Sequence, residues 1–289
     1  MKANTITLTQ PQLIDSIVQD LGLKPESKPR LIPALLSKIL QRFETSKDHH
    51  APWHYRSVIG KLNYQEKCSR PDIAYAVHDQ CARFCETPKV EHSDAVKRIG
   101  RYLLHTKERG MICSPTEESF QVYADADFAG NWNKDCAQQD SSTARSRSGY
   151  VVKYANCSLI WASKLQTEIA FSSTESEYIA LSQALREVIP LMRLVKELNK
   201  AGFSIHDHSP AVHCKLFEDN SGALEMVKHD KYRPRTKHIN IKYHHFREHV
   251  DKGLITVHAI RTQDQQADIF TKPLNDSAFA KFRRLIQGW

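Results

Sequence analysis

The sequence lacks the features of membrane, secreted and zinc-binding proteins. No apolar run approaches the ~18 residues that a helix needs to cross a bilayer. The first 30 residues have no continuous apolar core after a basic start, so they give no sign of a signal peptide. The seven cysteines are odd in number and never form a CxxC pair. We therefore expect reduced thiols, no zinc module and no membrane partner in an intracellular protein.

The composition supports a folded protein with a polyanionic partner. A chain of 289 residues with 40% hydrophobic and 26% charged residues is large enough for one large or two ordinary domains. Its formal net charge is +8, and its 15 histidines add positive charge at mildly acid pH. Basic proteins without a nucleic-acid role are also common, so charge alone leaves the partner open.

The first 115 residues are predicted to be mostly helical, because apolar residues recur there at helical spacing. The predicted elements are a strand over 4–9, a helix from Thr9 to Gly22, a linker-like segment over 24–53, and helices over 55–67, 72–86 and 93–107, the last capped by Ser93.

The helix over 93–107 has a basic side that carries Lys97 and Arg101. This side is either an ordinary solvated face or a surface that lies along a phosphate backbone, where neutralised phosphates release counterions. The sequence leaves both interpretations open.

After residue 115 the pattern changes to that of an α/β fold. The predicted elements are strands over 119–125, 149–154 and 157–163, a long helix over 173–200 with a kink at Pro190, a strand over 212–218, helices over 221–229 and 240–252, a strand over 255–260, and helices over 263–271 and 277–287. Three strands, a helix and then strand–helix units predict a mixed sheet flanked by helices.

Two acidic residues in this half stand among apolar neighbours. Asp125 lies at the end of an apolar strand, where burial of a carboxylate is costly without a cation. Glu177 shares a helical stripe with Leu181, and Glu175 is predicted to face solvent.

Two further acids follow in positions from which they can converge on the first pair. Asp219 ends a predicted strand, at the sheet edge where α/β folds place their sites. Asp268 lies in a short helix behind the last strand. Each has an ordinary explanation, such as a helix cap or a surface charge. Four together would repel one another unless cations neutralise them, as in two-metal phosphoryl chemistry. Oxygen-only ligands favour Mg²⁺, with Mn²⁺ also possible.

Several sequence blocks resemble the C-terminal part of copia-type (LTR retrotransposon) Pol polyproteins. They occur in family order over nearly the whole chain. The blocks are Tyr55–Tyr64, Ser69–Val77, Tyr123–Gly130, Ser148–Tyr150, Ser172–Leu181, Glu218–Asn220, Arg235–Ile239 and Gln266–Leu274.

The resemblance implies a reverse transcriptase thumb/connection-like remnant over 1–115 and a ribonuclease H-like domain over 116–289. It implies Mg²⁺-dependent cleavage of the RNA strand of RNA–DNA hybrids, with the upstream polymerase segments of the polyprotein as partners. The expected location is the cytoplasm, in a virus-like particle, or the nucleus. The implied catalytic and metal-binding residues are Asp125, Glu177, Asp219 and Asp268, and the candidate nucleic-acid contacts are Lys97, Arg101, Asn220, Arg235, Lys237 and His238.

Two departures from the family pattern limit this expectation. The chain has no Tyr-x-Asp-Asp turn, so we expect no DNA synthesis from this polypeptide alone. Only Arg261–Gln265 separates the last strand from the helix of Asp268, which leaves no room for the histidine loop of many cellular ribonucleases H. The alternative to a nuclease is a non-catalytic nucleic-acid-binding remnant. A transposase or integrase of related topology fits the blocks poorly.

Overall fold

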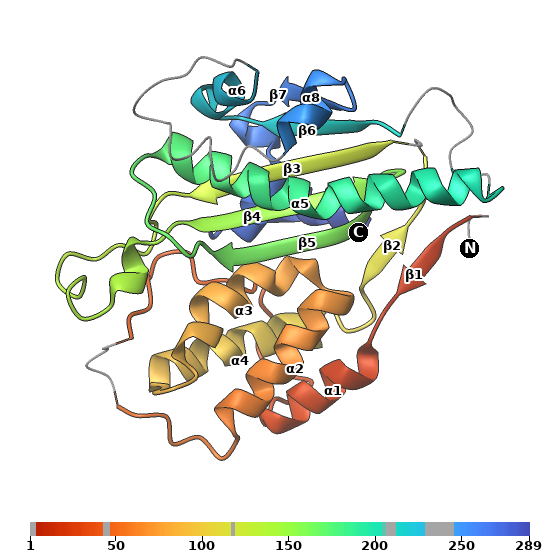
Figure 1. Cartoon of the computed structure of the whole chain (residues 1–289). Coiled ribbons are helices and arrows are strands. Elements are labelled where there is room, and N and C mark those ends of the chain that lie inside the picture. The colour runs from red at the N-terminus through yellow and green to blue at the C-terminus, as the bar shows by residue number, and fades with distance from the viewer. Residues whose placement is uncertain (1–3, 43–46, 117–118, 204, 206–211, 229–245) are drawn as a thin grey trace. The chain divides into compact units, whose positions relative to one another are not determined.

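The computed structural model describes residues 4–42, 47–116, 119–203, 205, 212–228 and 246–289 (Figure 1). Its contacts divide the chain into two compact units, each built from separate segments. Unit 1 comprises Met1–Thr5, Cys113–Gly130 and Arg145–Thr271, and unit 2 comprises Ile6–Ile112, Asn131–Ala144 and Lys272–Trp289. The division at residue 115 stays a prediction, and by contacts residues 131–144 and 272–289 group with the helical unit.

Unit 1 contains a five-stranded mixed sheet, as the sequence predicts. Its strand order is β5-β4-β3-β6-β7, in which β3 pairs antiparallel with β4 and parallel with β6. The β4–β5 turn holds Ala155 and Asn156 at φ 50° and 64°, the left-handed conformation of a tight hairpin. The strands are β3 (Phe120–Asp127), β4 (Arg147–Tyr154), β5 (Cys157–Leu165), β6 (Cys214–Glu218) and β7 (Ile255–Ala259).

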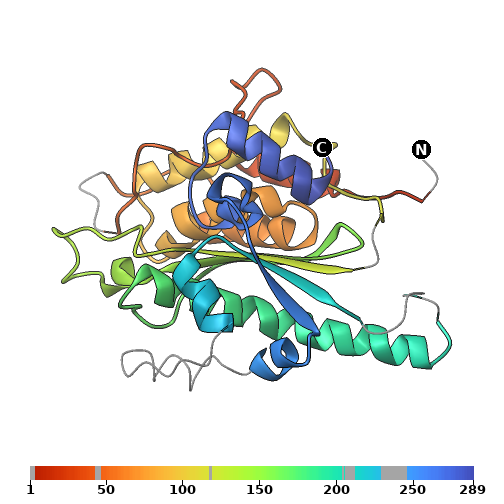
Figure 2. The same cartoon turned by 90° about the horizontal axis from the view of Figure 1, so that it is seen from above.

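Helix α5 (Ser173–Lys200) covers one face of this sheet (Figure 2). It continues without a break through Pro190. Val122 and Ala124 of β3 belong to the core that also contains α5, as strand alternation predicts. On α5, Leu181 is fully buried, so the predicted apolar stripe is the packed one.

The first turn of α5 corrects one prediction. Glu175 is 6% exposed rather than solvent-facing. The Ser172 hydroxyl accepts a hydrogen bond from Glu175 N–H at 3.1 Å, and the Glu175 carboxylate accepts one from Phe171 N–H at 2.8 Å. This reciprocal capping fixes the loop that enters the helix and explains the burial.

The remaining described helical elements of unit 1 are short. Helix α6 (Ser221–Lys228) follows β6, and α8 (Arg247–Asp251) is the described part of the helix predicted over 240–252, whose residues 240–245 lie outside the described ranges. The predicted helix over 263–271 is instead two 3₁₀ turns, η6 (Thr262–Asp264) and η7 (Gln266–Phe270). Gln265 separates them with an extended backbone, and its side-chain Nε2 donates to the Ala124 carbonyl at 2.9 Å.

Unit 2 is mostly helical. The predicted helix over 72–86 is broken at Cys81, whose φ of −133° and ψ of −56° end the helical run. The helix predicted over 93–107 begins earlier, with Lys89 rather than Ser93 as N-cap. Ser93 lies inside the helix, and its hydroxyl donates to the Lys89 carbonyl. The elements are β1 (Ile6–Leu8), α1 (Pro11–Asp20), α2 (Tyr55–Cys68), η1 (Pro71–Ile73), α3 (Ala74–Gln80), η2 (Ala82–Phe84), α4 (Val90–Leu104), η3 (Ser141–Ala144) and α9 (Asp276–Gln287), with β1 paired to β2 (Met111–Cys113).

A buried ion pair lies at the centre of unit 2. Arg70 Nε and Nη2 donate to the two carboxylate oxygens of Asp72 at 3.0 and 2.8 Å, and both side chains are fully buried. Tyr102 and Gln287 also donate to Asp72. Burial acts to raise the pKa of Asp72, but the guanidinium and these hydrogen bonds outweigh it and hold the pKa below its usual value.

The end of the chain takes part in the same network. The Arg70 guanidinium lies 5.4 Å from the centre of the Trp289 ring, and Trp289 Nε1 donates to the Gly110 carbonyl at 2.7 Å. Helix α9 is therefore an integral part of unit 2. Within the described ranges, no helix is both long enough and apolar enough to cross a membrane.

Candidate metal-binding active site

Three of the four predicted acids meet in unit 1. Asp125, Glu177 and Asp219 each offer a carboxylate oxygen, and these oxygens all lie within 4.8 Å of one another. They come from β3, α5 and the end of β6. β3 and β6 run parallel, so their carboxyl ends share one edge of the sheet, at the left of Figure 1, where α5 begins.

The side chain of Asp125 is held by Thr271, the residue that follows η7. The hydroxyl of the fully buried Thr271 donates to Asp125 Oδ2. Gly149 lies opposite Asp125 in β4, and a Cβ atom there would come within 2.6 Å of Thr271 Cγ2 and 2.8 Å of Phe270 Cβ. Glycine at 149 therefore lets the turn that carries Thr271 approach the strand closely.

Asp219 is positioned by the turn into α6. Asn220 Oδ1 accepts a hydrogen bond from Ala223 N–H at 3.0 Å and caps the helix, and Thr174 Oγ1 lies 3.4 Å from the same oxygen. A Cβ at Gly222 would lie 2.6 Å from Thr174 Oγ1. The first turns of α5 and α6 thus pack closely, which brings the chain segments of Glu177 and Asp219 together.

The electrostatics of the cluster are those of crowded, buried acids. Burial first, and then the charges of Asp125, Glu218 and Asp219, raise the pKa of Glu177 to about 11. Burial likewise raises the pKa of Glu218 well above its ordinary value, with the charges of Asp219 and Asp125 adding to the effect. Without a cation, the folded chain therefore favours protonated carboxyl groups here.

The fourth predicted acid, Asp268, is buried in η7 of the same unit. It is not one of the acids whose oxygens gather within 4.8 Å among the described residues. Its carbonyl oxygen lies 3.3 Å from Thr271 Oγ1, the hydroxyl that holds Asp125. Its backbone is therefore connected to the cluster through one side chain.

The chemistry of the cluster fits a divalent cation with hard oxygen ligands. The gathered donors are all carboxylates, and Asp125 and Glu177 are only 4% and 7% exposed. Glu177 Oε2 is buried with no hydrogen-bond partner in the part of the chain that the structure describes. Converging, desolvated carboxylates of this kind are suited to Mg²⁺ or Mn²⁺.

A stability measurement tests this electrostatic picture. Glu177 keeps its proton in the folded chain but loses it in the unfolded chain above its ordinary pKa of 4.5. The free energy of unfolding in EDTA should therefore fall as pH rises from about 5.5 to 8, by at most about 1.4 kcal/mol per pH unit for this group. Thermal melting at several pH values should show a shallower fall for Glu177→Gln than for the wild type. Equal slopes would contradict the assignment.

The predicted nucleic-acid contacts fall into three groups. Lys97 and Arg101 lie on α4 of unit 2 and are partly exposed. Asn220 uses its side-chain oxygen to cap α6. Arg235, Lys237 and His238 lie outside the described residues.

Sequence reasoning missed Thr271 and Glu218, two residues that adjoin the site. Thr271 follows Asp268 closely in a matched block, but no local pattern indicates that its hydroxyl meets Asp125. Glu218 occupies the last inward position of a strand whose other inward residues are Cys214 and Leu216. Strand alternation was the available signal for its burial.

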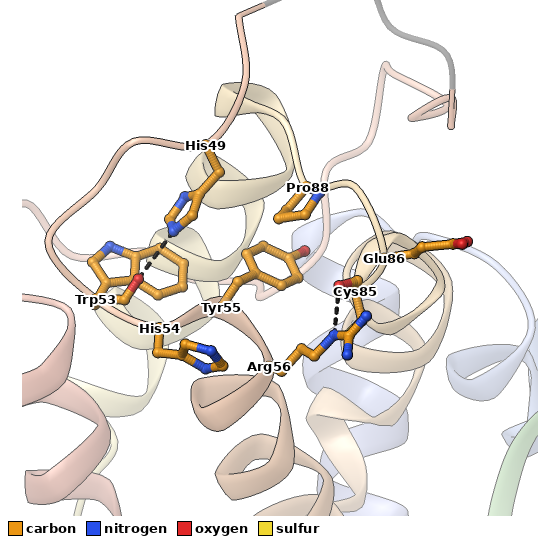
Figure 3. A pocket seen from close by; sticks show the side chains of 8 residues that line it. All are labelled: His49, Trp53, His54, Tyr55, Arg56, Cys85, Glu86 and Pro88. Carbon is orange, nitrogen blue, oxygen red and sulfur yellow. Dashed lines mark hydrogen bonds between the residues drawn. The ribbon is translucent and has the colours of Figure 1, made fainter.

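Unit 2 has a separate pocket of about 330 Å³ (Figure 3). The rings of Trp53 and Tyr55 stack within it, with 5.7 Å between their centres. His49 Nε2 hydrogen-bonds to the Trp53 carbonyl, and Arg56 Nε donates to the Cys85 carbonyl. Its lining contains a single carboxylate and so does not offer a comparable cation site. The lining residues are His49, Trp53, His54, Tyr55, Arg56, Cys85, Glu86 and Pro88.

The sheet topology is that of a ribonuclease H-like fold. Three antiparallel strands are followed by two parallel ones, with a long helix over one face and acids at the carboxyl edge. The chain belongs to the family of copia-type retrotransposon Pol polyproteins.

This membership rests on similarity over most of the chain. The Pol polyprotein from transposon TNT 1-94 of Nicotiana tabacum is 33% identical over 284 residues, which are 96% of this chain and 20% of that protein. The Pol polyprotein from transposon RE2 of Arabidopsis thaliana is 34% identical over 236 residues, 81% of this chain and 15% of that protein. The chain thus spans a fifth or less of the length of these relatives.

The sequence and the structure were also compared with protein-family models and with solved structures. No protein-family model matches the sequence. Among solved structures, LC11-RNase H1, isolated from compost by a metagenomic approach, is similar with a TM-score of 0.37 and 16% identity, over 57% of this chain and 98% of that one.

Proposed function

We propose that this chain is a divalent-metal-dependent endoribonuclease that cuts the RNA strand of RNA–DNA hybrids. The observation that carries the proposal is the convergence of Asp125, Glu177 and Asp219 within 4.8 Å at the carboxyl edge of the sheet. Family membership supports the same activity. A Pol polyprotein copies RNA into DNA, and this copying produces an RNA–DNA hybrid as an intermediate.

Each acid has a distinct role in this proposal. Asp125 and Asp219 are the main ligands of Mg²⁺, and Thr271 orients Asp125 through its hydroxyl. Glu177 is a ligand that also positions the attacking water, and Asp268 is an outer ligand. When bound, the metal lowers the pKa of water and stabilises the leaving 3′ oxygen, so that 5′-phosphate and 3′-hydroxyl ends result.

The substrate is proposed to be read by shape rather than base sequence. Hybrid recognition of this kind uses minor-groove 2′-hydroxyls and the backbones of both strands. The net charge of +8 favours such a polyanion. The proposed contacts are Lys97, Arg101, Asn220, Arg235, Lys237 and His238, and the proposed protein partners are the upstream polymerase segments of the polyprotein.

An assay with an end-labelled hybrid tests the function directly. The full-length chain is expected to cut the RNA strand in the presence of Mg²⁺ and not in EDTA, while leaving single-stranded RNA and duplex DNA intact. Mn²⁺ is expected to replace Mg²⁺. Products separated on a sequencing gel should carry 5′-phosphates.

The same assay decides against the proposal if the outcome differs. Hybrid binding without cleavage at any Mg²⁺ or Mn²⁺ concentration would identify a non-catalytic nucleic-acid-binding remnant. Strand transfer on duplex DNA would instead indicate a transposase or integrase. Extension of a primed template would refute the expectation that this polypeptide alone makes no DNA.

A further inference from the structure

Glu218 is a buried carboxyl group beside the candidate site that the roles above do not use. It is the last residue of β6 and 0% exposed, and it directly precedes Asp219. Cys214 and Leu216, the other inward residues of β6, are in the core that contains α5. Strand alternation therefore directs Glu218 toward the side of the sheet from which Glu177 comes.

The two oxygens of Glu218 have different surroundings. Oε1 accepts a hydrogen bond from Asn220 N–H at 2.9 Å and so supports the turn that presents Asp219. Oε2 is buried with no hydrogen-bond partner among the described residues. An unsatisfied buried oxygen is unfavourable, and more so when the group is charged.

The charges that reach Glu218 are negative. Asp219 and Asp125 both act on it electrostatically, and Glu218 in turn acts on Glu177. In the part of the chain that the structure describes, no Lys, Arg or His forms an ion pair with Glu218. A buried carboxyl group without a cationic partner takes up a proton, and a nearby cation favours its ionised form.

We propose that Glu218 is a further carboxylate of the divalent-cation site, which strengthens cation binding through its charge and Oε2. Its oxygens are not in the group that lies within 4.8 Å, so Glu218 supplements Glu177 and Asp219 and does not replace either as a ligand. Glu218 is a positioning residue with two functions. Its charge strengthens cation binding, and its Oε1 holds the turn at Asn220. The inference rests on the proposed function, because it requires the cation site.

The substitution Glu218→Gln separates the two functions. Glutamine keeps the side-chain length and the oxygen that accepts from Asn220 N–H, but it removes the charge. Glu225→Gln is the matched control, because Glu225 is an exposed glutamate on the adjoining helix α6. A structural role alone would leave the metal affinity of Glu218→Gln unchanged.

The experiment is calorimetric titration of the full-length chain with MnCl₂, together with thermal melting in EDTA. Glu218→Gln is expected to raise the Kd for Mn²⁺ about tenfold, as for other groups that support metal ligands. Its melting temperature in EDTA should be equal to or above the wild-type value, because a glutamine does not have to take up a proton in order to be buried. Hybrid binding in EDTA should be unchanged, and Glu225→Gln should match the wild type throughout.

Each other outcome has a definite meaning. An unchanged Kd in Glu218→Gln, with binding lost in Asp125→Asn, would overturn the role of Glu218 while the function stands. If the wild type itself binds no Mn²⁺, the proposed function fails with it. If Glu218→Gln does not fold, Glu218→Met removes the charge together with the oxygen that accepts from Asn220 N–H. It must then weaken Mn²⁺ binding at least tenfold, and an unchanged Kd would overturn the inference.

Discussion

Replacing Asp125 with asparagine is expected to abolish hybrid cleavage while sparing hybrid binding. Asn keeps the shape of the side chain and the oxygen that accepts from Thr271, but it removes the charge from a site where three carboxylates converge. Loss of a catalytic metal ligand should lower the cleavage rate by about 1,000-fold or more. Single-turnover cleavage in Mg²⁺ and gel-shift binding in EDTA measure the two effects separately.

The same strand supplies a matched control. Asp127 has the same residue type, follows two positions later in β3 and shares its face. It is not one of the acids that gather within 4.8 Å, among the residues that the structure describes. Asp127→Asn should therefore keep most of the activity. The opposite result, an active Asp125→Asn and an inactive Asp127→Asn, would transfer the role to Asp127.

Replacing Asp72 with alanine should be among the most destabilising single changes in the chain. Arg70 would keep its charge in a fully buried position without the carboxylate that now binds both its Nε and Nη2. Breaking a buried pair by removing one partner typically costs about 3–5 kcal/mol. Urea unfolding measures this cost, and Trp289 fluorescence is a local reporter because its ring packs against Arg70.

An exposed ion pair is the appropriate comparison. Lys200 and Glu197 lie 2.9 Å apart on α5 with side chains 62% and 65% exposed. Glu197→Ala should cost less than about 1 kcal/mol. If Asp72→Ala proves no more destabilising than Glu197→Ala, the buried network does not stabilise unit 2 as described.

The sequence predicted those features that depend on local periodicity. Alternation in β3 places Asp125 on the face opposite Val122 and Ala124, the helical stripe of α5 places Glu177 with Leu181, and the strand-to-helix transition locates Asp219. These three positions required no knowledge of distant contacts. The mixed sheet followed from the order of strands and helices.

The features that were missed depend on contacts between distant residues. Glu175 was expected to face solvent, but it turns inward to accept a hydrogen bond from Phe171. The contact of Thr271 with Asp125 joins residues 146 positions apart, and that of Gln287 with Asp72 joins residues 215 positions apart. No periodicity of one segment can predict such pairs. For the same reason the inclusion of α9 in unit 2 could not be anticipated.

The interleaving of the two units determines how the chain can be divided for biochemical work. A fragment that starts at residue 116 would carry α9 away from the segments 6–112 that belong to the same unit, and would expose Phe279, Phe282 and Ile286, which are buried in the whole chain. Such a truncation should aggregate through that uncovered helix face. Recombinant expression of a catalytic piece would therefore have to omit residues 272–289 as well, or retain the entire polypeptide.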